Sequence, residues 1–236
     1  MNILESKEAS TNRDANFDKW WDTYGEWFES GDQLVSGESG IQRLHAADGR
    51  LLYSKRQVNH LSRSALHPFG RPTILDELQA LEALKHLGVR VPDVVFSDAR
   101  KVNGEWQALL VTEALEGFNS LEDWYLKGTP QSGDEALNQQ MLRQLANTVG
   151  LMHVGGWEHG RLSPKTIFVK VRMQGDEAVP EIALLGLAKA RHHMSTHQAS
   201  SHDFDYFKAH HQPMPESDWV QFAHAYRGVL ESDYIR

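Results

Sequence analysis

Length, composition and charge narrow the classes of protein to which this chain can belong. It has 236 residues, 40% hydrophobic and 24% charged, which is enough for one large globular domain or two small lobes. The net charge of -8 argues against a nucleic-acid-binding surface, which needs clustered Lys and Arg. The lack of Cys excludes disulfides, a thiol nucleophile and a zinc–thiolate site.

The sequence predicts a cytoplasmic protein without a transmembrane segment. No apolar run approaches the ~20 residues that a membrane-spanning helix needs. The N-terminus is polar and acidic, unlike a signal peptide. We expect residues 1–16, which are rich in Ser, Asn, Glu and Asp, to form a mobile tail.

Aromatic side chains in residues 17–28 recur at the spacing of one helical face. They are Phe17, Trp20, Trp21, Tyr24, Trp27 and Phe28. The pattern predicts a helix that packs on the sheet formed by the following residues. A platform on which a ligand stacks is the alternative.

The next segment has the pattern of a β-hairpin that ends near a lysine. Two alternating apolar stretches, 41–44 and 51–56, flank Asp48-Gly49, a pair that favours a tight turn. Residues 31–40 contain glycines, and Lys55 lies near the end of the second predicted strand. Protein kinases combine a Gly-rich phosphate cover with a strand Lys in this way. Because a full G-x-G-x-x-G motif is lacking, the signal is weak alone.

A helix that carries a glutamate is predicted after this hairpin. Pro72 suits the first helical turn, leucines recur from 75 to 84, and Gly88 suits the end. Glu77 follows Lys55 by about twenty residues, the separation at which a kinase helix supplies the Glu that holds the Lys. A solvated surface Glu is the alternative.

The following residues predict the join between two lobes. Residues 91–96 and 106–112 have strand patterns on either side of a turn at 102–105. The linker that begins at Glu113 lies where a kinase hinge offers backbone groups to adenine, so Glu113 is a nucleotide-binding candidate. A long helix is predicted over 134–153.

The long helix leads into a stretch with the outline of a kinase catalytic loop, H-[RG]-D-L-x-x-x-N. The stretch is His159-Gly160-Arg161-Leu162-Ser163-Pro164-Lys165-Thr166. In a kinase the Asp accepts the proton of the substrate hydroxyl and the Asn binds a metal ion. Here Arg161 and Thr166 occupy these two positions. An ordinary turn before a strand is the alternative.

A second metal-ligand position also lacks a carboxylate. Residues 182–191 predict an apolar strand where a kinase carries an Asp that ligates magnesium, and this chain has Gly186 there. A helix-like stretch at 202–207 follows too soon for a long activation segment, which argues against an ancestral protein substrate. Ser217-Asp218 predicts the cap of a last helix.

Two stretches are specific enough to indicate a family, Gly70-Arg71-Pro72-Thr73 and Ala108 to Glu113. Further matches are Trp20-Trp21, Ser39-Gly40, Lys55-Arg56, Asp123-Trp124-Tyr125, His202-Asp203-Phe204 and Asp218-Trp219. On these residues the chain resembles the lipopolysaccharide kinase (Kdo/WaaP) family, and in particular its InaA-type members, over residues 17–226. The resemblance implies an α+β, two-lobed, protein-kinase-like fold, with a small antiparallel-sheet N-lobe over 17–112 and a mostly helical C-lobe over 113–236.

The resemblance also implies site residues and ATP as the cofactor. It places Lys55 at the lysine that binds the ATP phosphates and Glu77 at its partner. Arg161, Thr166 and Gly186 depart from the H-G-D-L-x-x-x-N loop and the later Asp of the kinases in this family. InaA-type members also look degenerate in the catalytic loop, but they commonly carry L-D-L-E-K where this chain has L-G-L-A-K.

We therefore interpret the chain as a pseudokinase in which His159, Arg161 and Thr166 form a degenerate catalytic loop. With Lys55 and Arg161 facing one cleft and no carboxylate for Mg²⁺, the site would bind nucleotide without a metal, or another anionic small molecule. The alternative is an active kinase that transfers phosphate from ATP to a lipopolysaccharide core sugar or a related hydroxyl compound, with Glu158 or His159 as a substitute group.

Histidines concentrated in the C-terminal third support a third hypothesis, a pH- or stress-responsive binding module. They are His192, His193, His197, His202, His210 and His211. Acid-responsive expression is part of the family picture, and it concerns regulation of the gene. A metal site is another interpretation of these histidines, although their spacings match no standard metal-ligand pattern. Scattered surface histidines are the alternative to both interpretations. The sequence identifies no protein partner.

Overall fold

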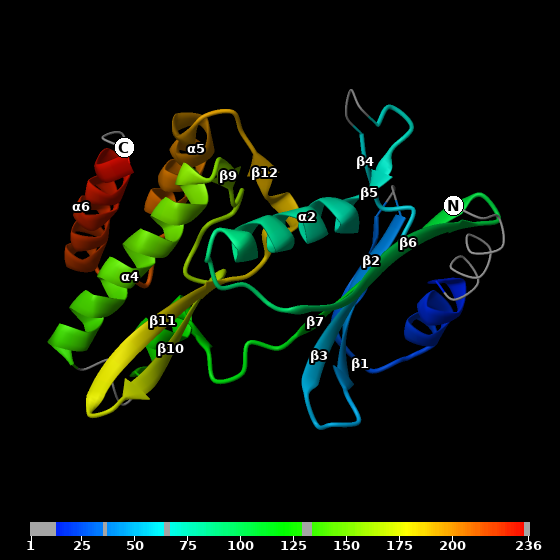
Figure 1. The fold of residues 1–236 in the computed structure, drawn as a ribbon, viewed down its shortest axis with the longest axis horizontal. Helices are drawn as coiled ribbons and strands as arrows, with labels where there is room; N and C mark the ends of the chain where they lie inside the picture. The colour runs from blue at the N-terminus through cyan, green and yellow to red at the C-terminus, as the bar shows by residue number, and fades with distance from the viewer. Residues whose placement is uncertain (1–12, 35–36, 64–66, 129–133, 234–236) are drawn as a thin grey trace, which may run out of the picture. The chain divides into compact units, whose positions relative to one another are not determined.

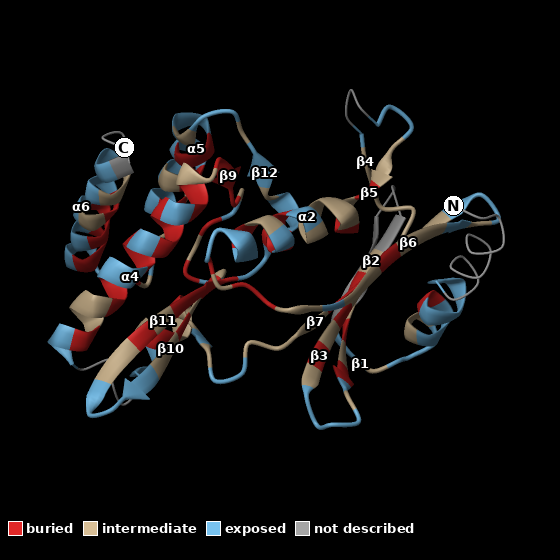
Figure 2. Ribbon diagram, in the orientation of Figure 1, coloured by how far each residue is buried: buried red, intermediate tan, exposed pale blue. Residues whose placement is uncertain are grey.

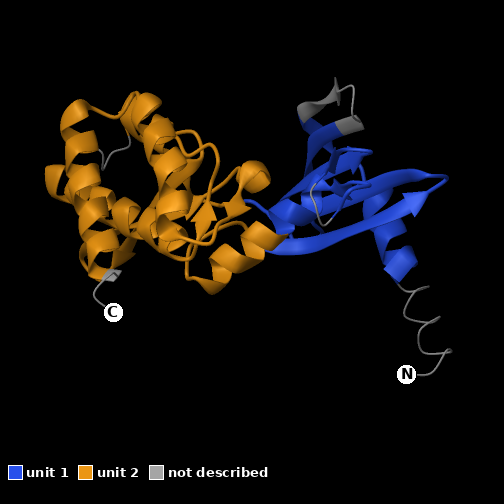
Figure 3. Cartoon of the chain, turned by 90° about the horizontal axis from the view of Figure 1, so that it is seen from above, with its two compact units in different colours: residues 1–78, 93–114 blue, residues 79–92, 115–236 orange. Residues whose placement is uncertain are grey.

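The chain forms two compact units in the computed structural model. The first unit comprises residues 1–78 and 93–114, and the second comprises residues 79–92 and 115–236 (Figure 3). The structure describes residues 13–34, 37–63, 67–128 and 134–233. Most of the predicted mobile tail therefore lies outside the described residues, and its last four residues, 13–16, are helical.

The first unit is built on a five-stranded antiparallel sheet with the strand order β1-β2-β3-β7-β6. The strands are β1 (Glu26–Leu34), β2 (Gly37–His45), β3 (Leu51–Val58), β6 (Val94–Val102) and β7 (Glu105–Glu113). Two short strands, β4 (Leu61–Ser62) and β5 (Arg71–Pro72), pair with each other before helix α2 (Thr73–His86) (Figure 1).

Both predicted hairpins are present in this sheet. β2 pairs with β3 around the Asp48-Gly49 turn, and β6 pairs with β7 around Asn103-Gly104. Asn103 and Gly104 have φ values of 51° and 90°. Asn and Gly tolerate the left-handed backbone that such a turn requires, so these connections follow from the local sequence.

The aromatic segment at the N-terminus is helical only in its first part. Residues 13–21 are helical, and the rings of Trp21 and Trp20 stack on Phe17 and Phe96 with centroids 5.5 and 5.9 Å apart. The predicted packing on the sheet is therefore present. The predicted helix up to residue 28 is wrong, because β1 begins at Glu26 and pairs with β2. At the edge of the sheet, β1 pairs its backbone N–H and C=O groups with those of β2. The spacing of aromatic side chains gives no information about this backbone pairing.

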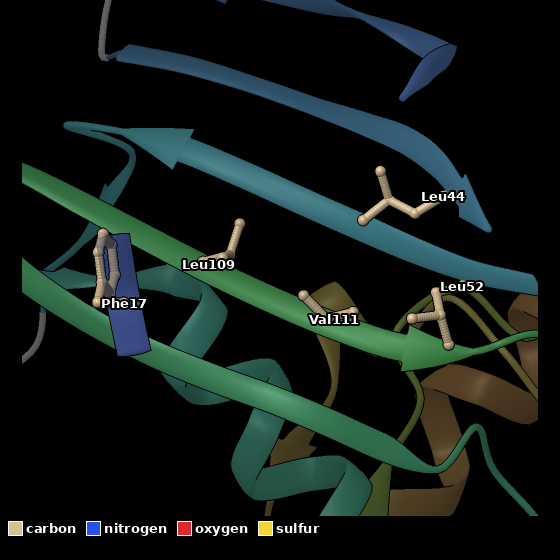
Figure 4. Close-up of a cluster of buried hydrophobic side chains, with 5 residues drawn as sticks. All are labelled: Phe17, Leu44, Leu52, Leu109 and Val111. Atoms are coloured by element: carbon tan, nitrogen blue, oxygen red, sulfur yellow. The ribbon is translucent and has the colours of Figure 1, made fainter. Parts of the chain in front are cut away.

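The core of the first unit lies between this helix and the sheet. It contains the buried residues Phe17, Leu44, Leu52, Leu109 and Val111 (Figure 4). Side chains alternate between the faces of a strand, so Lys55 on β3 lies on the face opposite to Leu52. The apolar cluster therefore orients the strand and leaves Lys55 pointing away from it.

The second unit is mostly helical and includes two small sheets. Its helices are α3 (Leu121–Asp123), α4 (Glu135–Val154), α5 (Thr196–Ala209) and α6 (Glu216–Asp233), with a π-helix at Trp124–Gly128 and a 3₁₀ helix at Leu187–Lys189. The sheets have the orders β11-β10-β8 and β12-β9, formed by β8 (Asn119–Ser120), β9 (Trp157–Glu158), β10 (Ile167–Gln174), β11 (Glu177–Leu184) and β12 (Arg191–His192). No helix within the described ranges is long and apolar enough to cross a membrane.

Helix α4 supplies much of the core of the second unit. Its buried face includes Met141, Leu145, Val149 and Met152, and it packs against α5, α6 and β11 (Figures 1 and 2). The predicted apolar face of a helix over 134–153 is thus present. Asp134 caps the helix, since its side chain accepts hydrogen bonds from the backbone of Ala136 and Leu137. These buried contacts fix the helix that leads into residues 155–166.

Two predicted boundaries in this unit are wrong. The strand predicted over 182–191 ends at Leu184, where its partner β10 begins with the pair Ile167 and Leu184. The last helix begins at Glu216, before the predicted Ser217-Asp218 cap. Asp218 lies inside α6, and its carboxylate accepts hydrogen bonds from Tyr125 and Asn138.

Candidate functional site

Lys55 and Glu77 form a partly buried ion pair in the first unit. Lys55 Nζ lies 2.6 Å from Glu77 Oε2, and the two side chains are 18% and 13% exposed. Lys55 comes from β3 and Glu77 from the second turn of α2. The structure therefore brings together the two residues whose spacing predicted a phosphate-binding Lys and its partner. Their role in binding a nucleotide stays a prediction.

Gln57 fixes the position of helix α2 against strand β3. Its Oε1 atom accepts hydrogen bonds from the backbone N–H of Ile74 at 3.2 Å and from Thr73 Oγ1 at 3.0 Å. The first N–H groups of a helix have no partner within the helix, so Gln57 satisfies one of them. Residues two apart on a strand share a face, which places Gln57 beside Lys55. Gln57 follows Lys55 by two residues on β3, a spacing that identifies the two as neighbours on one face. Our sequence analysis did not use this spacing.

Glu113 ends strand β7 and pairs with Leu52 of β3. Its carboxylate accepts a hydrogen bond from the Arg50 guanidinium, and its backbone N–H donates to the carbonyl of Asp93 at 2.9 Å. The Glu113 side chain is thus engaged in an ion pair at the surface. Its predicted place in a nucleotide hinge stays a prediction.

His159 is a buried, neutral structural residue of the loop that follows α4. Its Nε2 atom lies 2.9 Å from the carbonyl oxygen of Leu185, so it donates a hydrogen bond there. Its Nδ1 atom accepts from the backbone N–H of Arg161 at 3.3 Å. Burial lowers the pKa of His159 below its usual value, against the opposing charge of Asp203. Both ring nitrogens are thus engaged, and the imidazole holds the loop rather than presenting a free base.

Asp203 on α5 anchors the same loop, and the sequence analysis missed its role. Its buried carboxylate accepts hydrogen bonds from the backbone N–H groups of His159 and Gly160, the latter at 2.8 Å, and from His153 Nε2 at 3.2 Å. Burial alone would raise the pKa of Asp203, but the hydrogen bonds from His153 and His159 outweigh it and lower that pKa. The only signal in the sequence was the His202-Asp203-Phe204 match to the family.

Arg161 and Thr166 occupy the positions of the kinase base and the metal-binding Asn. Arg161 is exposed, and its guanidinium keeps its charge at any relevant pH. The Thr166 hydroxyl accepts from the backbone N–H of Ser163 at 3.0 Å and lies 3.2 Å from the carbonyl oxygen of Arg161. Thr166 therefore uses its hydroxyl to close the loop.

Gly186 lies beside Thr166 in the second unit. A Cβ atom built on Gly186 would lie 3.3 Å from Thr166 Cγ2. The backbone N–H of Leu185 also donates to the carbonyl of Thr166 at 2.9 Å. The two positions that the sequence analysis aligned with metal ligands of a kinase are thus adjacent in the second unit. Magnesium prefers carboxylate oxygens in octahedral geometry, and a loop-closing hydroxyl beside a glycine does not provide that donor set.

Comparisons with known proteins assign the chain to a family. Residues 18–226 match the model of the lipopolysaccharide kinase (Kdo/WaaP) family. The chain belongs to this family. It is 38% identical over 205 residues to Protein InaA of Escherichia coli (strain K12), a match that covers 87% of this chain and 92% of InaA. The family predicted from the residues is thereby confirmed.

Solved structures confirm the protein-kinase-like fold of this family member. WaaP, in a structure described as a complex with acyl carrier protein, matches with a TM-score of 0.63 and 18% identity, covering 93% of this chain and 90% of WaaP. Amicoumacin kinase hAmiN, in a structure with AMP-PNP, Ca²⁺ and Ami, matches with a TM-score of 0.57 and 14% identity, covering 98% of this chain and 80% of hAmiN. At these identities the likeness shows the fold alone.

Proposed function

We propose that this chain is a pseudokinase of the lipopolysaccharide kinase family that binds a nucleotide or another anionic small molecule through Lys55, without Mg²⁺. One observation carries the proposal. The adjacent positions of the two kinase metal ligands hold Thr166, whose hydroxyl closes its own loop, and Gly186, which has no side chain.

The missing groups account for most of the chemistry of phosphoryl transfer. Metal ions neutralise the charge that develops on the transferred phosphoryl group and orient it. A positioned general base contributes roughly 10²–10⁴-fold to a rate. Arg161 cannot accept a proton, and His159 already uses both ring nitrogens within the loop. The loop therefore retains its shape through His159 and Asp203 while it lacks the groups that act on a substrate.

The groups that recognise phosphate are better preserved. Holding the ammonium of Lys55 and the carboxylate of Glu77 partly out of water costs free energy, which their ion pair offsets. Gln57 holds α2 in the register that this pair requires. An ammonium held in this way offers three N–H donors and a positive charge to a phosphate or a carboxylate. An anion that binds there needs no metal to be recognised by Lys55.

The runner-up is an active small-molecule kinase that phosphorylates a lipopolysaccharide core sugar or a related hydroxyl compound. Family membership and the Lys55–Glu77 pair favour it. The carboxylates that such a kinase needs as a base and as Mg²⁺ ligands would have to come from residues other than 161, 166 and 186. Glu158 was named above as a substitute group for this reaction, but its carboxylate already contacts the rings of His193 and His202.

Thermal unfolding with ATP, ADP and GTP, each with and without Mg²⁺, separates the two functions. A ligand at about 100 times its Kd stabilises the folded state by about 2.7 kcal/mol. We expect a rise in Tm that does not depend on Mg²⁺, that Lys55→Ala abolishes and that Lys101→Ala, an exposed lysine of the same unit, leaves unchanged. A rise that requires Mg²⁺, together with phosphate transfer that Lys55→Ala abolishes, would establish the kinase instead. No rise with any nucleotide would exclude nucleotides and direct the search to other anions.

A further inference from the structure

Four side chains from three separate segments of the sequence lie close together in the second unit. Glu158 belongs to β9, His193 follows β12, and His202 and Asp203 are neighbours on α5. Glu158 Oε2 lies 2.5 Å from His193 Nε2, and Glu158 Oε1 lies 2.7 Å from His202 Nδ1. One ligand atom each from Glu158, His202 and Asp203 all lie within 4.8 Å of one another.

We propose that Glu158, His202 and Asp203 bind a zinc-class divalent transition metal, with His193, which contacts the other oxygen of Glu158, as a neighbouring imidazole that completes the site once its ring has moved. Imidazole nitrogens and carboxylate oxygens are frequent ligands of Zn²⁺, with Zn–N and Zn–O distances of about 2.0–2.2 Å. Imidazole also suits Cu²⁺ and Ni²⁺, whereas Mg²⁺ and Ca²⁺ prefer sites made of oxygen atoms alone. The site is therefore distinct in chemistry from a nucleotide-bound magnesium.

The ligand atoms of Glu158, His202 and Asp203 are already close enough for a small movement to bring them around one ion. Ligands of a tetrahedral zinc lie roughly 3.3 Å apart. Glu158 Oε1 and His202 Nδ1 are 2.7 Å apart, so this pair would separate by less than about an ångström, whereas His193 would have to move further to reach the same ion. His202 is 58% exposed, which gives an ion access from solvent and gives its ring room to turn.

The backbone around the cluster is held in place by other contacts. The backbone N–H of His193 donates to the carbonyl of Gly156 at 2.7 Å, and β12 pairs with β9 through Arg191 and Glu158. Asp203 is held by the backbone N–H groups of His159 and Gly160. Ligands from elements that are already fixed lose less conformational entropy when they bind an ion.

The position of the cluster gives metal binding a consequence for the degenerate loop. Glu158 directly precedes His159, and Asp203 holds the backbone of both His159 and Gly160. A metal at Glu158 would connect β9, the segment after β12 and α5. We therefore expect it to reduce local opening of residues 156–160, and not only to raise overall stability.

The sequence could not have indicated this site by spacing. Local zinc motifs place pairs of ligands two to five residues apart, whereas Glu158 and His193 are separated by 35 positions. Only the pairing of β9 with β12 and the packing of α5 on β9 bring the ligands together. Of the histidines in the C-terminal third, His193 and His202 contact Glu158, whereas His197 and His210 are exposed elsewhere on or beside α5.

Equilibrium dialysis of tag-free, EDTA-treated protein against Zn²⁺, with the bound metal quantified, tests the proposal. We expect one equivalent to bind, at least tenfold weaker binding in His202→Gln, and a smaller loss in His193→Gln. His202 is more than half exposed, so His202→Gln should fold, which its far-UV circular dichroism would confirm. The matched control is His197→Gln on the same helix, which should bind as the wild type does. Lys55→Ala should also bind zinc normally, which separates this site from the proposed anion site.

Hydrogen exchange provides a second readout that adsorption of zinc to surface histidines would not affect. With one equivalent of Zn²⁺, amide exchange of residues 156–160 should slow in the wild type and in His197→Gln, but not in His202→Gln. The proposal is overturned if no stoichiometric zinc binds. It is equally overturned if both cluster variants bind zinc as tightly as the wild type, because Glu158, His193 and His202 would then form a hydrogen-bonded cluster without a metal.

Discussion

At the scale of single residues, Asp203 holds three hydrogen-bond donors in a place that solvent does not reach. Two of them are the backbone N–H groups of His159 and Gly160, and the third is the ring of His153. The loop that contains Arg161 and Thr166 is thus held by the carboxylate of Asp203, which lies on α5 and outside the catalytic-loop motif.

Asp203→Ala should destabilise the protein by about 3–5 kcal/mol, because removing one partner of a buried charged network leaves its donors unpaired. Urea unfolding followed by circular dichroism measures this change. The buffer should contain EDTA, so that loss of a bound metal does not contribute. The matched control is Asp205→Ala, an exposed position two residues further along α5, which should change the free energy of unfolding by less than about 0.5 kcal/mol. Equal effects of the two variants would show that Asp203 is not an anchor.

The sequence indicated the site residues unevenly, and the reason differs from one residue to another. Lys55 and Glu77 were predicted because a strand and the helix after it place them at a fixed separation, and the structure brings them to 2.6 Å. Asp203 and His202 follow the catalytic loop by about forty residues, and nothing local in the chain pairs them with it. Their contacts depend on how α5 packs on β9, which is a property of the folded unit.

At the scale of elements, hairpins were predictable and strand ends were not. Asp48-Gly49 and Asn103-Gly104 specify their turns locally, so the strands beside them were found. β11 ends at Leu184 because its partner β10 begins at Ile167, and the chain then turns at Gly186 with a φ of 79°. The residues directly after Leu184 are still apolar, as in a strand, but β10 does not extend far enough to pair with them. Such an end is set by a partner elsewhere in the chain, which a single stretch of sequence does not contain.

Three helical elements of the second unit meet at Asp218 of α6. The hydroxyl of Tyr125, in the π-helix, donates to Asp218 Oδ2 at 2.8 Å, and Asn138 Nδ2 of α4 donates to the same atom at 2.8 Å. Burial raises the pKa of Tyr125 above its usual value of about 10, and the hydrogen bond to Asp218 adds to the rise. The folded protein therefore keeps the phenol proton at a pH at which the unfolded chain releases it.

The unfolding free energy should accordingly fall at alkaline pH. Below about pH 10 both states hold the Tyr125 proton, and the contribution of this group is fully present. Above that pH only the unfolded chain loses the proton, so stability falls by up to about 1.4 kcal/mol per pH unit until the folded pKa is reached. Tyr125→Phe should reduce this slope between about pH 10 and 11.5 in urea titrations, and the slope that remains belongs in part to Tyr226, whose pKa burial also raises.

Asn138→Ala is the matched control for this alkaline effect. It removes the second hydrogen bond to Asp218 Oδ2 and the acceptor of the Trp124 indole N–H, and should lower stability at neutral pH by about 1–3 kcal/mol. It retains the Tyr125 phenol, so the alkaline slope should persist. If Tyr125→Phe left the slope of the wild type unchanged, the buried phenol would not be its source.

At the scale of the whole molecule, this family member combines a complete Lys–Glu pair in the first unit with an incomplete catalytic loop in the second. If the chain binds its ligand without Mg²⁺ because it lacks the metal ligands, as we propose, then restoring these ligands should create a role for Mg²⁺. The structure indicates that the substitutions are compatible with the fold. Arg161 is exposed, and Asp is among the few residues that tolerate the positive φ of position 186, at a cost of about 1–2 kcal/mol.

The triple variant Arg161→Asp, Thr166→Asn, Gly186→Asp tests this directly. Thr166→Asn removes the Cγ2 methyl that a Cβ at position 186 would approach to 3.3 Å, so the two substitutions suit each other. We expect ATP to raise the Tm of the triple variant more with Mg²⁺ than without it, whereas the wild type shows no such difference. Adding Lys55→Ala should abolish the response to ATP. A triple variant that folds and binds ATP but ignores Mg²⁺ would show that more than these three positions separates this chain from an active kinase.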